Sequence, residues 1–335
     1  MKRTILLATL PLVLLCACNK DSAIQEKESN TASFTAIANH DDTKTTITES
    51  GSGPYTYSMT WDGGEAVRLV HLVYPTPTET NTTNSIYFGS TYPFTNVASA
   101  GSSALFTPSS SFPFSFEVGD PFYVCGGDSY RAVTVKRAST DPADITVTSF
   151  ITRQRIPANQ EYTPSSNLGI NANIIPIFGV VKKGEGSGFE PAAVQMSTDA
   201  AIVKFVVTNN SGSNKTIGKI TMAGSSDGLQ SGIAGDLYVS TNCSTWARGQ
   251  FQLYTDVHYT TINLNCNNTT IANGESKTFG FVVWGRLSRD TMGNLTWTVY
   301  DSADNNIASA QNLQSTGITI QAGKVYTKTC VIPAP

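Results

Sequence analysis

The chain has 335 residues, of which only 14% are charged, and its formal net charge is −3. A protein that binds the phosphates of a nucleic acid needs a dense lysine and arginine surface, so this composition argues against a nucleic-acid partner. Hydrophobic residues still make up 40% of the chain, and Gly, Ser, Thr and Asn are abundant. This mixture is typical of many short strands joined by polar turns, and the length suffices for two domains.

The first 17 residues predict a lipoprotein signal peptide. Residues 1–3 supply a positive start, and residues 4–15 form an almost unbroken apolar run that is too short to span a bilayer. Ala17 precedes Cys18, and Leu15 stands three positions before it, which resembles the lipobox of bacterial lipoproteins. We therefore expect cleavage before Cys18 and a lipid such as palmitate on Cys18, which would hold the chain on the outer membrane. An ordinary leader with an incidental cysteine is the alternative.

Residues 18–31 are polar apart from Ile24 and predict a tether. Segments rich in β-branched and aromatic residues then follow at 32–38, 44–48, 55–61 and 66–74, divided by turn-forming stretches such as "SGSGP". Further strand-like segments continue to about residue 152, and no amphipathic helix of ten residues or more is predicted.

The passage "VVKKGEGSGFEP" at residues 180–191 predicts a domain boundary, because it is rich in glycine and lysine and lies between two strand-rich halves. Strand-like alternation resumes at residues 200–210 and continues to "GKVYTKTCVIP" near the end. We therefore predict an all-β chain with two β-sandwich domains, residues 32–185 and 190–335.

Four cysteines remain after Cys16 and Cys18 are assigned to the leader and the lipid. In an exported protein disulfides are permitted, and the pair that we would test first is Cys243 with Cys266. Buried free thiols are the alternative. A zinc site would need a CxxC pair or nearby histidines, and neither occurs, so no metal or cofactor is expected.

The sequence contains one short match to a known catalytic motif. "GSSDG" at residues 224–228 fits the pattern of a hydrolase nucleophile elbow with Ser226, but no helix is predicted after it, so we interpret it as a loop between strands. The cluster "DSADNN" at residues 301–306 could hold calcium in principle, although such clusters are ordinary turn sequences.

Core burial is expected for three of the four tryptophans, Trp61, Trp284 and Trp297, whereas Trp246 lies in a polar loop. The chain is therefore predicted not to be an enzyme.

The order of several segments resembles the fimbrillin family of Bacteroidetes, lipoprotein precursors of type V pili. These segments are "CNKDS", "ASFTAIANHDDTKTTI", "TWDGGEAVRLV", "AAIVKFVVTNNSGSNKTIGKITMAGSSDGLQSGIAGDLYV", "NGESKTFGFVVWG" and "IQAGKVYTKT". The resemblance covers most of the chain after residue 17, but it holds no motif as discriminating as a catalytic signature.

The resemblance implies two tandem transthyretin-like sandwich domains and assembly by strand exchange, in which a first strand is removed and a strand of another subunit fills the groove. Mapped onto this chain, the removable strand is residues 32–38, with Phe34 and Ile37 as bulky anchors. The cut would fall in residues 39–44. The implied partners are other fimbrial subunits, and host glycan or protein for an adhesive role.

Two features depart from the family pattern. Members processed by an Arg-specific protease carry an arginine in the loop, whereas Lys44 is the only basic residue there. After "GKVYTKTCVI" only three residues remain, which favours a tip, anchor or accessory subunit over a shaft subunit. The alternative function is a monomeric surface lipoprotein that binds glycan or a host ligand through loops such as "CSTWARGQF".

Overall fold

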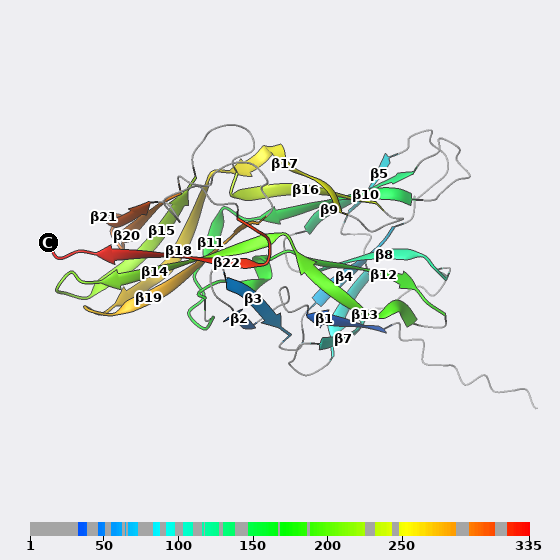
Figure 1. Cartoon of the computed structure of the whole chain (residues 1–335), viewed down its shortest axis with the longest axis horizontal. Helices are drawn as coiled ribbons and strands as arrows, with labels where there is room; N and C mark the ends of the chain where they lie inside the picture. Colours follow the sequence, from blue (N-terminus) through cyan, green and yellow to red (C-terminus); the bar gives the residue numbers. More distant parts are fainter. Residues whose placement is uncertain are drawn as a thin grey trace, which may run out of the picture. The chain divides into compact units, whose positions relative to one another are not determined.

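The computed structural model describes residues 33–38, 46–50, 55–61, 64, 66–72, 83–87, 92–97, 103–109, 116, 118–126, 130–137, 147–166, 168–185, 188–224, 232–242, 248–285, 295–311 and 320–335. Most of these residues belong to β-strands, so the predicted all-β class is confirmed (Figure 1). The only helix described is a single 3-10 turn, η2 (Ala172–Ile174). No helix in these ranges has the length and apolar character to span a membrane.

Seven strands form a closed barrel in the order β1-β13-β12-β8-β4-β6-β7. They are β1 (Ser33–Ala38), β4 (Ala66–His71), β6 (Tyr92–Asn96), β7 (Ser103–Pro108), β8 (Pro121–Gly126), β12 (Ile177–Lys183) and β13 (Gly188–Thr198). Aromatic side chains pack against one another in its core: the ring of Phe122 lies 5.6 Å from that of Phe189, and the ring of Phe94 lies 6.1 Å from the same residue. Edge-to-face aromatic pairs of this kind stabilise a core beyond the area that they bury.

A second sheet has the order β17-β16-β10-β9-β5. Its strands are β5 (Thr83–Tyr87), β9 (Tyr130–Arg137), β10 (Val147–Ile156), β16 (Ala234–Asn242) and β17 (Arg248–Tyr259). Tyr123 of the barrel packs its ring 5.3 Å from that of Phe150 in β10. Because side chains alternate along a strand, Tyr123 lies on the opposite face of β8 from the core residues Phe122 and Val124, so this contact packs β10 against the outer face of the barrel.

The remaining two sheets form a sandwich. One sheet, β19-β14-β22-β3-β2, contains β2 (Thr46–Ser50), β3 (Tyr55–Thr60), β14 (Ala200–Asn209), β19 (Ser276–Trp284) and β22 (Lys324–Ile332). The other, β11-β18-β15-β20-β21, contains β11 (Asn159–Glu161), β15 (Lys215–Ala223), β18 (Thr261–Ile271), β20 (Thr296–Asp301) and β21 (Asn306–Gln311). Phe205 of β14 stacks on Trp297 of β20 at 5.5 Å, which joins the two sheets through the core.

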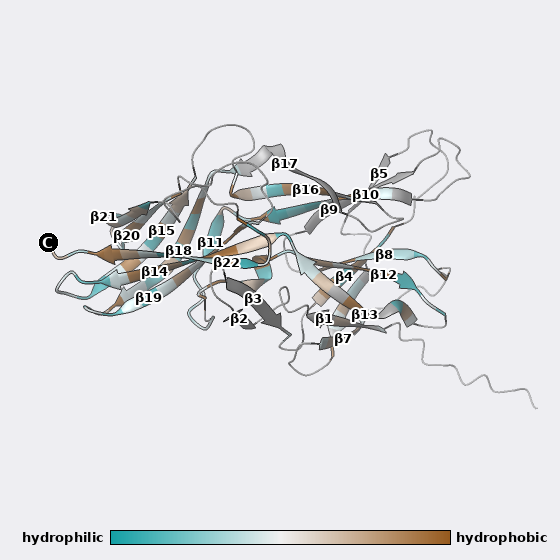
Figure 2. Cartoon of the chain, viewed as in Figure 1, coloured by the Kyte–Doolittle hydropathy of each residue, from teal (hydrophilic) through white to brown (hydrophobic). Residues whose placement is uncertain are grey.

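Burial follows the expected period of two along the second half of β14. Along β14 the residues Val203, Phe205 and Val207 are fully buried, whereas Lys204, Val206 and Thr208 between them are half-buried. Hydrophobic and hydrophilic segments accordingly succeed one another along this strand (Figure 2). Because successive side chains point to opposite faces of a sheet, this alternation assigns one face to the core.

The predicted boundary near residues 185–190 coincides with a turn inside the barrel. Gly184 donates a backbone hydrogen bond to the carbonyl of Gly188 at 3.0 Å, which closes a hairpin between β12 and β13. Strand pairing crosses this position in three other sheets, since β10 pairs with β16, β11 with β18 and β22 with β3. The glycine-rich passage therefore marks a hairpin, and the number of domains stays a prediction.

Candidate functional site

The first described strand, β1, closes the barrel by pairing on both of its edges. It is antiparallel to β7, with Ala36 opposite Ala104, and parallel to β13, with Ala36 opposite Val194. All three residues are at most 2% exposed. With β1 in place neither β7 nor β13 has a free edge within the barrel, and removing β1 would open both edges at once.

The groove that β1 fills is lined by apolar side chains. Beside Ala104 and Val194, the buried residues Phe106 of β7 and Met196 of β13 stand opposite positions in β1. The ring of Phe106 lies 5.0 Å from that of Trp61, which is itself fully buried. An empty groove with these walls would expose apolar area together with unpaired backbone groups, which is the combination that accepts an added strand.

The register separates the two predicted anchors of β1. Phe34 stands opposite the buried Phe106, whereas Ile37 stands opposite the exposed Ser103. Within the pairing register, Phe34, Ala36 and Ala38 therefore occupy the positions that oppose buried residues. Sequence reasoning selected the bulky residues of the strand and missed Ala36. This residue matters because it is fully buried between two strands.

Several predicted site residues lie outside the described part of the chain: the lipidation site Cys18, the processing site Lys44, and Cys243. Cys266, the proposed disulfide partner of Cys243, is a free and fully buried thiol in the structure, and the bridge itself stays a prediction because Cys243 is not among the described residues. Burial raises the pKa of the Cys266 thiol to about 12. The alternative expectation of buried free thiols describes Cys266, Cys125 and Cys330.

The residues considered for catalysis or metal binding do not assemble into a site among the described residues. Ser226 lies outside them, and among the described residues no group of three His, Cys, Asp or Glu side chains could hold a metal ion. The carboxylate of Asp301 accepts hydrogen bonds from the backbone N–H groups of Ala303 and Asn305 and from the Asn305 amide. These donors lower the pKa of Asp301 and complete a polar turn.

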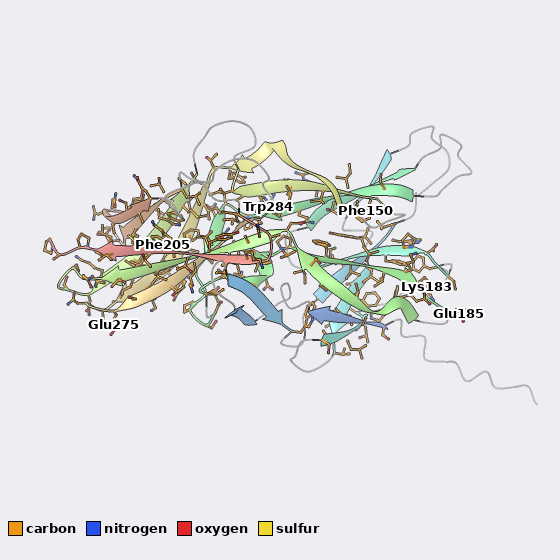
Figure 3. All side chains as sticks on the ribbon, in the orientation of Figure 1. Phe150, Lys183, Glu185, Phe205, Glu275 and Trp284 are labelled. Atoms are coloured by element: carbon orange, nitrogen blue, oxygen red, sulfur yellow. The ribbon has the colours of Figure 1, made fainter. Side chains whose placement is uncertain are left out.

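Three tryptophans occupy the core as predicted: Trp61, Trp284 and Trp297 are fully buried. Trp284 also donates from its indole nitrogen to the carbonyl of Gly235 at 3.3 Å, and it lies where strands from several sheets meet (Figure 3). These side chains are therefore not available as a platform for stacking sugars. Trp246 lies outside the described residues.

His71 and Asp120 form a half-buried pair at one end of the barrel. The Nε2 atom of His71 lies 3.0 Å from Oδ2 of Asp120, and its ring stacks on Phe122 at 4.7 Å. The ring of Phe116 packs edge-on against the same histidine at 4.5 Å. Burial lowers the pKa of His71, and the neighbouring Asp120 opposes that shift without cancelling it.

We expect this histidine to make stability depend on pH. Because its pKa is lower in the folded chain than the ordinary value of 6.5, its contribution is fully present above that value and is lost as the pH falls through the folded pKa. In His71→Gln, which keeps a side-chain donor but cannot titrate, the free energy of unfolding should fall less steeply on acidification. Urea titrations of both proteins at several pH values check this, and identical slopes would contradict it.

Sequence reasoning also missed a charged cluster on β10 and β16. The carboxylate of Asp236, which is fully buried, accepts a hydrogen bond from Nε of Arg153 at 2.6 Å and is bound by Nε and Nη2 of Arg155. The pairing register, in which Arg155 is opposite Asp236, places the three residues together. Arg153 and Arg155 stand two positions apart, which is a signal that they share a face, but their partner strand lies about 80 residues away and could not be identified.

Comparison with known proteins gives matches only among solved structures. No family model matches the sequence, and no curated protein matches it. Similar solved structures include a candidate cell adhesion protein from Bacteroides ovatus, with a TM-score of 0.40, 11% identity, and coverage of 82% of this chain and 84% of that chain. A candidate cell adhesion protein from Bacteroides fragilis has a TM-score of 0.38, 12% identity, and coverage of 90% and 93%. A fimbrial assembly protein from Parabacteroides distasonis has a TM-score of 0.28, 10% identity, and coverage of 89% and 90%.

Proposed function

We propose that this chain is a non-enzymatic structural or adhesive component of a bacterial surface fimbrium, and that it joins its neighbours by exchange of β1. The observation that carries the proposal is the place of β1, which fills a groove between β7 and β13 and pairs with both. A strand at this position can be replaced by a strand of another chain with the same register, because backbone hydrogen bonds supply affinity and alternate side-chain positions supply specificity.

The proposal includes the expected lipid on Cys18, which would hold the protein on the outer membrane until the strand is exchanged. Processing at Lys44 would separate Cys18 and β1 from the rest of the chain. Cys18 would then serve in export only. Without processing, the same lipid would keep the protein on the membrane. A place at the tip, at the anchor or as an accessory subunit stays a prediction.

The test releases β1 under control. A cleavage site for a specific protease is placed within residues 39–45, the protein is cut, and a fluorescent peptide of residues 31–39 is added. We expect the cut protein to exchange its own N-terminal segment for the peptide, seen as a rise in anisotropy and as a matching change in intact mass. The uncut protein should not bind the peptide, because its groove stays filled.

Two variants of the peptide test the register. Ala36→Asp places a charge at the fully buried position opposite Val194 and Ala104, so binding should weaken by at least about tenfold. Ile37→Asp changes the position opposite the exposed Ser103 and should bind nearly as well. If the cut protein retains its own N-terminal segment in every condition and forms no oligomers, the proposal of strand exchange is wrong. A sharp monomer band of surface-extracted protein at every temperature would instead favour the monomeric binding protein.

A further inference from the structure

The sandwich is sealed along one side by a segment that covers the edge of β19. The Gln160 side-chain amide donates to the Val282 carbonyl at 2.8 Å, and the Val282 N–H donates to Gln160 Oε1 at 3.0 Å. Next along β19, a Cβ at Gly280 would lie 2.3 Å from the carbonyl oxygen of Leu168. We call residues 157–166 and 168–170 the strap. Its close approach leaves no room for another strand at β19.

The opposite side of the sandwich differs, because β21 and β22 lie side by side without pairing (Figure 1). Among the described residues, β21 pairs only with β20, and β22 beyond Val325 pairs only with β14. The carbonyl of Ile332 accepts from Asn210 beside β14. Since backbone groups alternate in direction along a strand, Thr327, Thr329 and Val331 direct their N–H and C=O groups away from β14.

Lys328 lies in the middle of the part of β22 that has no partner among the described residues on its outer side, and the register places it on the core face. It stands opposite Phe205 in the parallel pairing of β22 with β14, and Phe205 is fully buried against Trp297. The flanking residues on the same face, Tyr326 and Cys330, are 6% and 5% exposed, whereas Lys328 is half-buried. Long lysine side chains at such positions commonly bury their aliphatic stem and keep the ammonium group in water.

A lysine on the inner face of an edge strand selects what can pair there. Two β22 edges that met about their centres would bring two Lys328 ammonium groups together, so self-pairing is opposed. A strand with a carboxylate at the matching position would pair this charge and could place apolar residues beside Tyr326 and Cys330. The same side chain therefore excludes one class of partner and favours another.

We infer that the outer edge of β22 is a second strand-docking surface, and that its occupant is an extended segment of another protein chain with apolar residues on both sides of a carboxylate that faces Lys328. The segment continues the line of β3, which already pairs with Lys324 and Val325. This surface is separate from the β1 groove, so it is occupied without release of β1. The inference therefore does not rest on strand exchange.

The test uses the full-length chain and three labelled peptides that alternate threonine with core-facing residues: TVTETVT, TVTQTVT and TVTKTVT. We expect the glutamate peptide to bind about tenfold more tightly than the lysine peptide, because a favourable cross-strand pair replaces a repulsive one. The variant Lys328→Glu should reverse this order. Fluorescence anisotropy at low ionic strength measures the affinities, and circular dichroism confirms that the variant is folded.

The matched control is Thr329→Glu, which makes the same addition of negative charge one residue along the strand but on the exposed outer face. It should leave the order of the three peptides unchanged. The inference is overturned if no peptide binds the wild-type chain, or if peptides bind with an order that Lys328→Glu does not alter. Should Lys328→Glu fail to fold, Lys328→Gln takes its place and should abolish the difference between the glutamate and lysine peptides.

Discussion

Replacing Asp236 by asparagine should lower the free energy of unfolding by about 3–5 kcal/mol, the usual effect of removing one partner from a buried ion pair. The carboxylate is fully buried, and the side chains of Arg153 and Arg155 are only 33% and 29% exposed. Asparagine keeps the size of the side chain and one carbonyl oxygen, but it removes the charge that both guanidinium groups share. The two arginines would then repel each other across an uncharged amide.

Urea denaturation of the wild-type chain and of Asp236→Asn measures this loss. The matched control is Asp304→Asn, which breaks an ion pair with Lys219 at 3.0 Å in which the two side chains are 77% and 38% exposed. An exposed pair contributes about 0–1 kcal/mol, so the control should change stability little. Equal losses in the two variants would show that burial of Asp236 does not govern its contribution.

This cluster also shows where sequence reasoning stops. The local pattern "AGDLYVS" is sufficient to predict that the segment with Asp236 is a strand. It does not predict which strand pairs with it, because pairing in a sheet joins segments far apart in sequence. At Arg155 and Asp236, β10 and β16 are joined across 81 residues. A buried charge is therefore recognisable only after its counter-charge has been placed.

The β1 strand shows the opposite case. It is predicted at residues 32–38 and found as Ser33–Ala38, because a short alternating segment bounded by turn residues carries its own signal. The sequence of the segment does not predict its pairing register. Ala36 is fully buried because β7 and β13 lie on its two sides, and its own size gives no sign of this.

The strap illustrates a third limit, since its central contact is made by a polar side chain. Glutamine is usually exposed, and nothing in "IPANQEYTP" indicates that Gln160 is 3% exposed and bound to the backbone of Val282, 122 residues away. The amide of Gln160 reproduces the donor and acceptor pattern of a strand, so it completes the edge of β19 without adding one.

Gln160→Met should therefore destabilise the chain by about 2–6 kcal/mol, since it leaves the buried N–H and C=O of Val282 each without a partner at about 1–3 kcal/mol apiece. Methionine matches the length of glutamine and removes only its hydrogen bonds. Urea denaturation measures the loss, and hydrogen exchange should show faster exchange of the Val282 amide. The neighbouring Glu161→Gln, at an exposed position of β11, should change stability by no more than about 0.5 kcal/mol.

A second variant separates the two hydrogen bonds of this contact. In Gln160→Glu an ionised carboxylate can accept from the Val282 N–H but cannot donate to the Val282 carbonyl, whereas a protonated carboxyl group can do both. The stability of this variant relative to wild type should therefore recover as the pH is lowered through the titration range of the new carboxyl group. If Gln160→Met is as stable as the wild-type chain, the strap does not seal β19, and that edge is then as open to an added strand as β22.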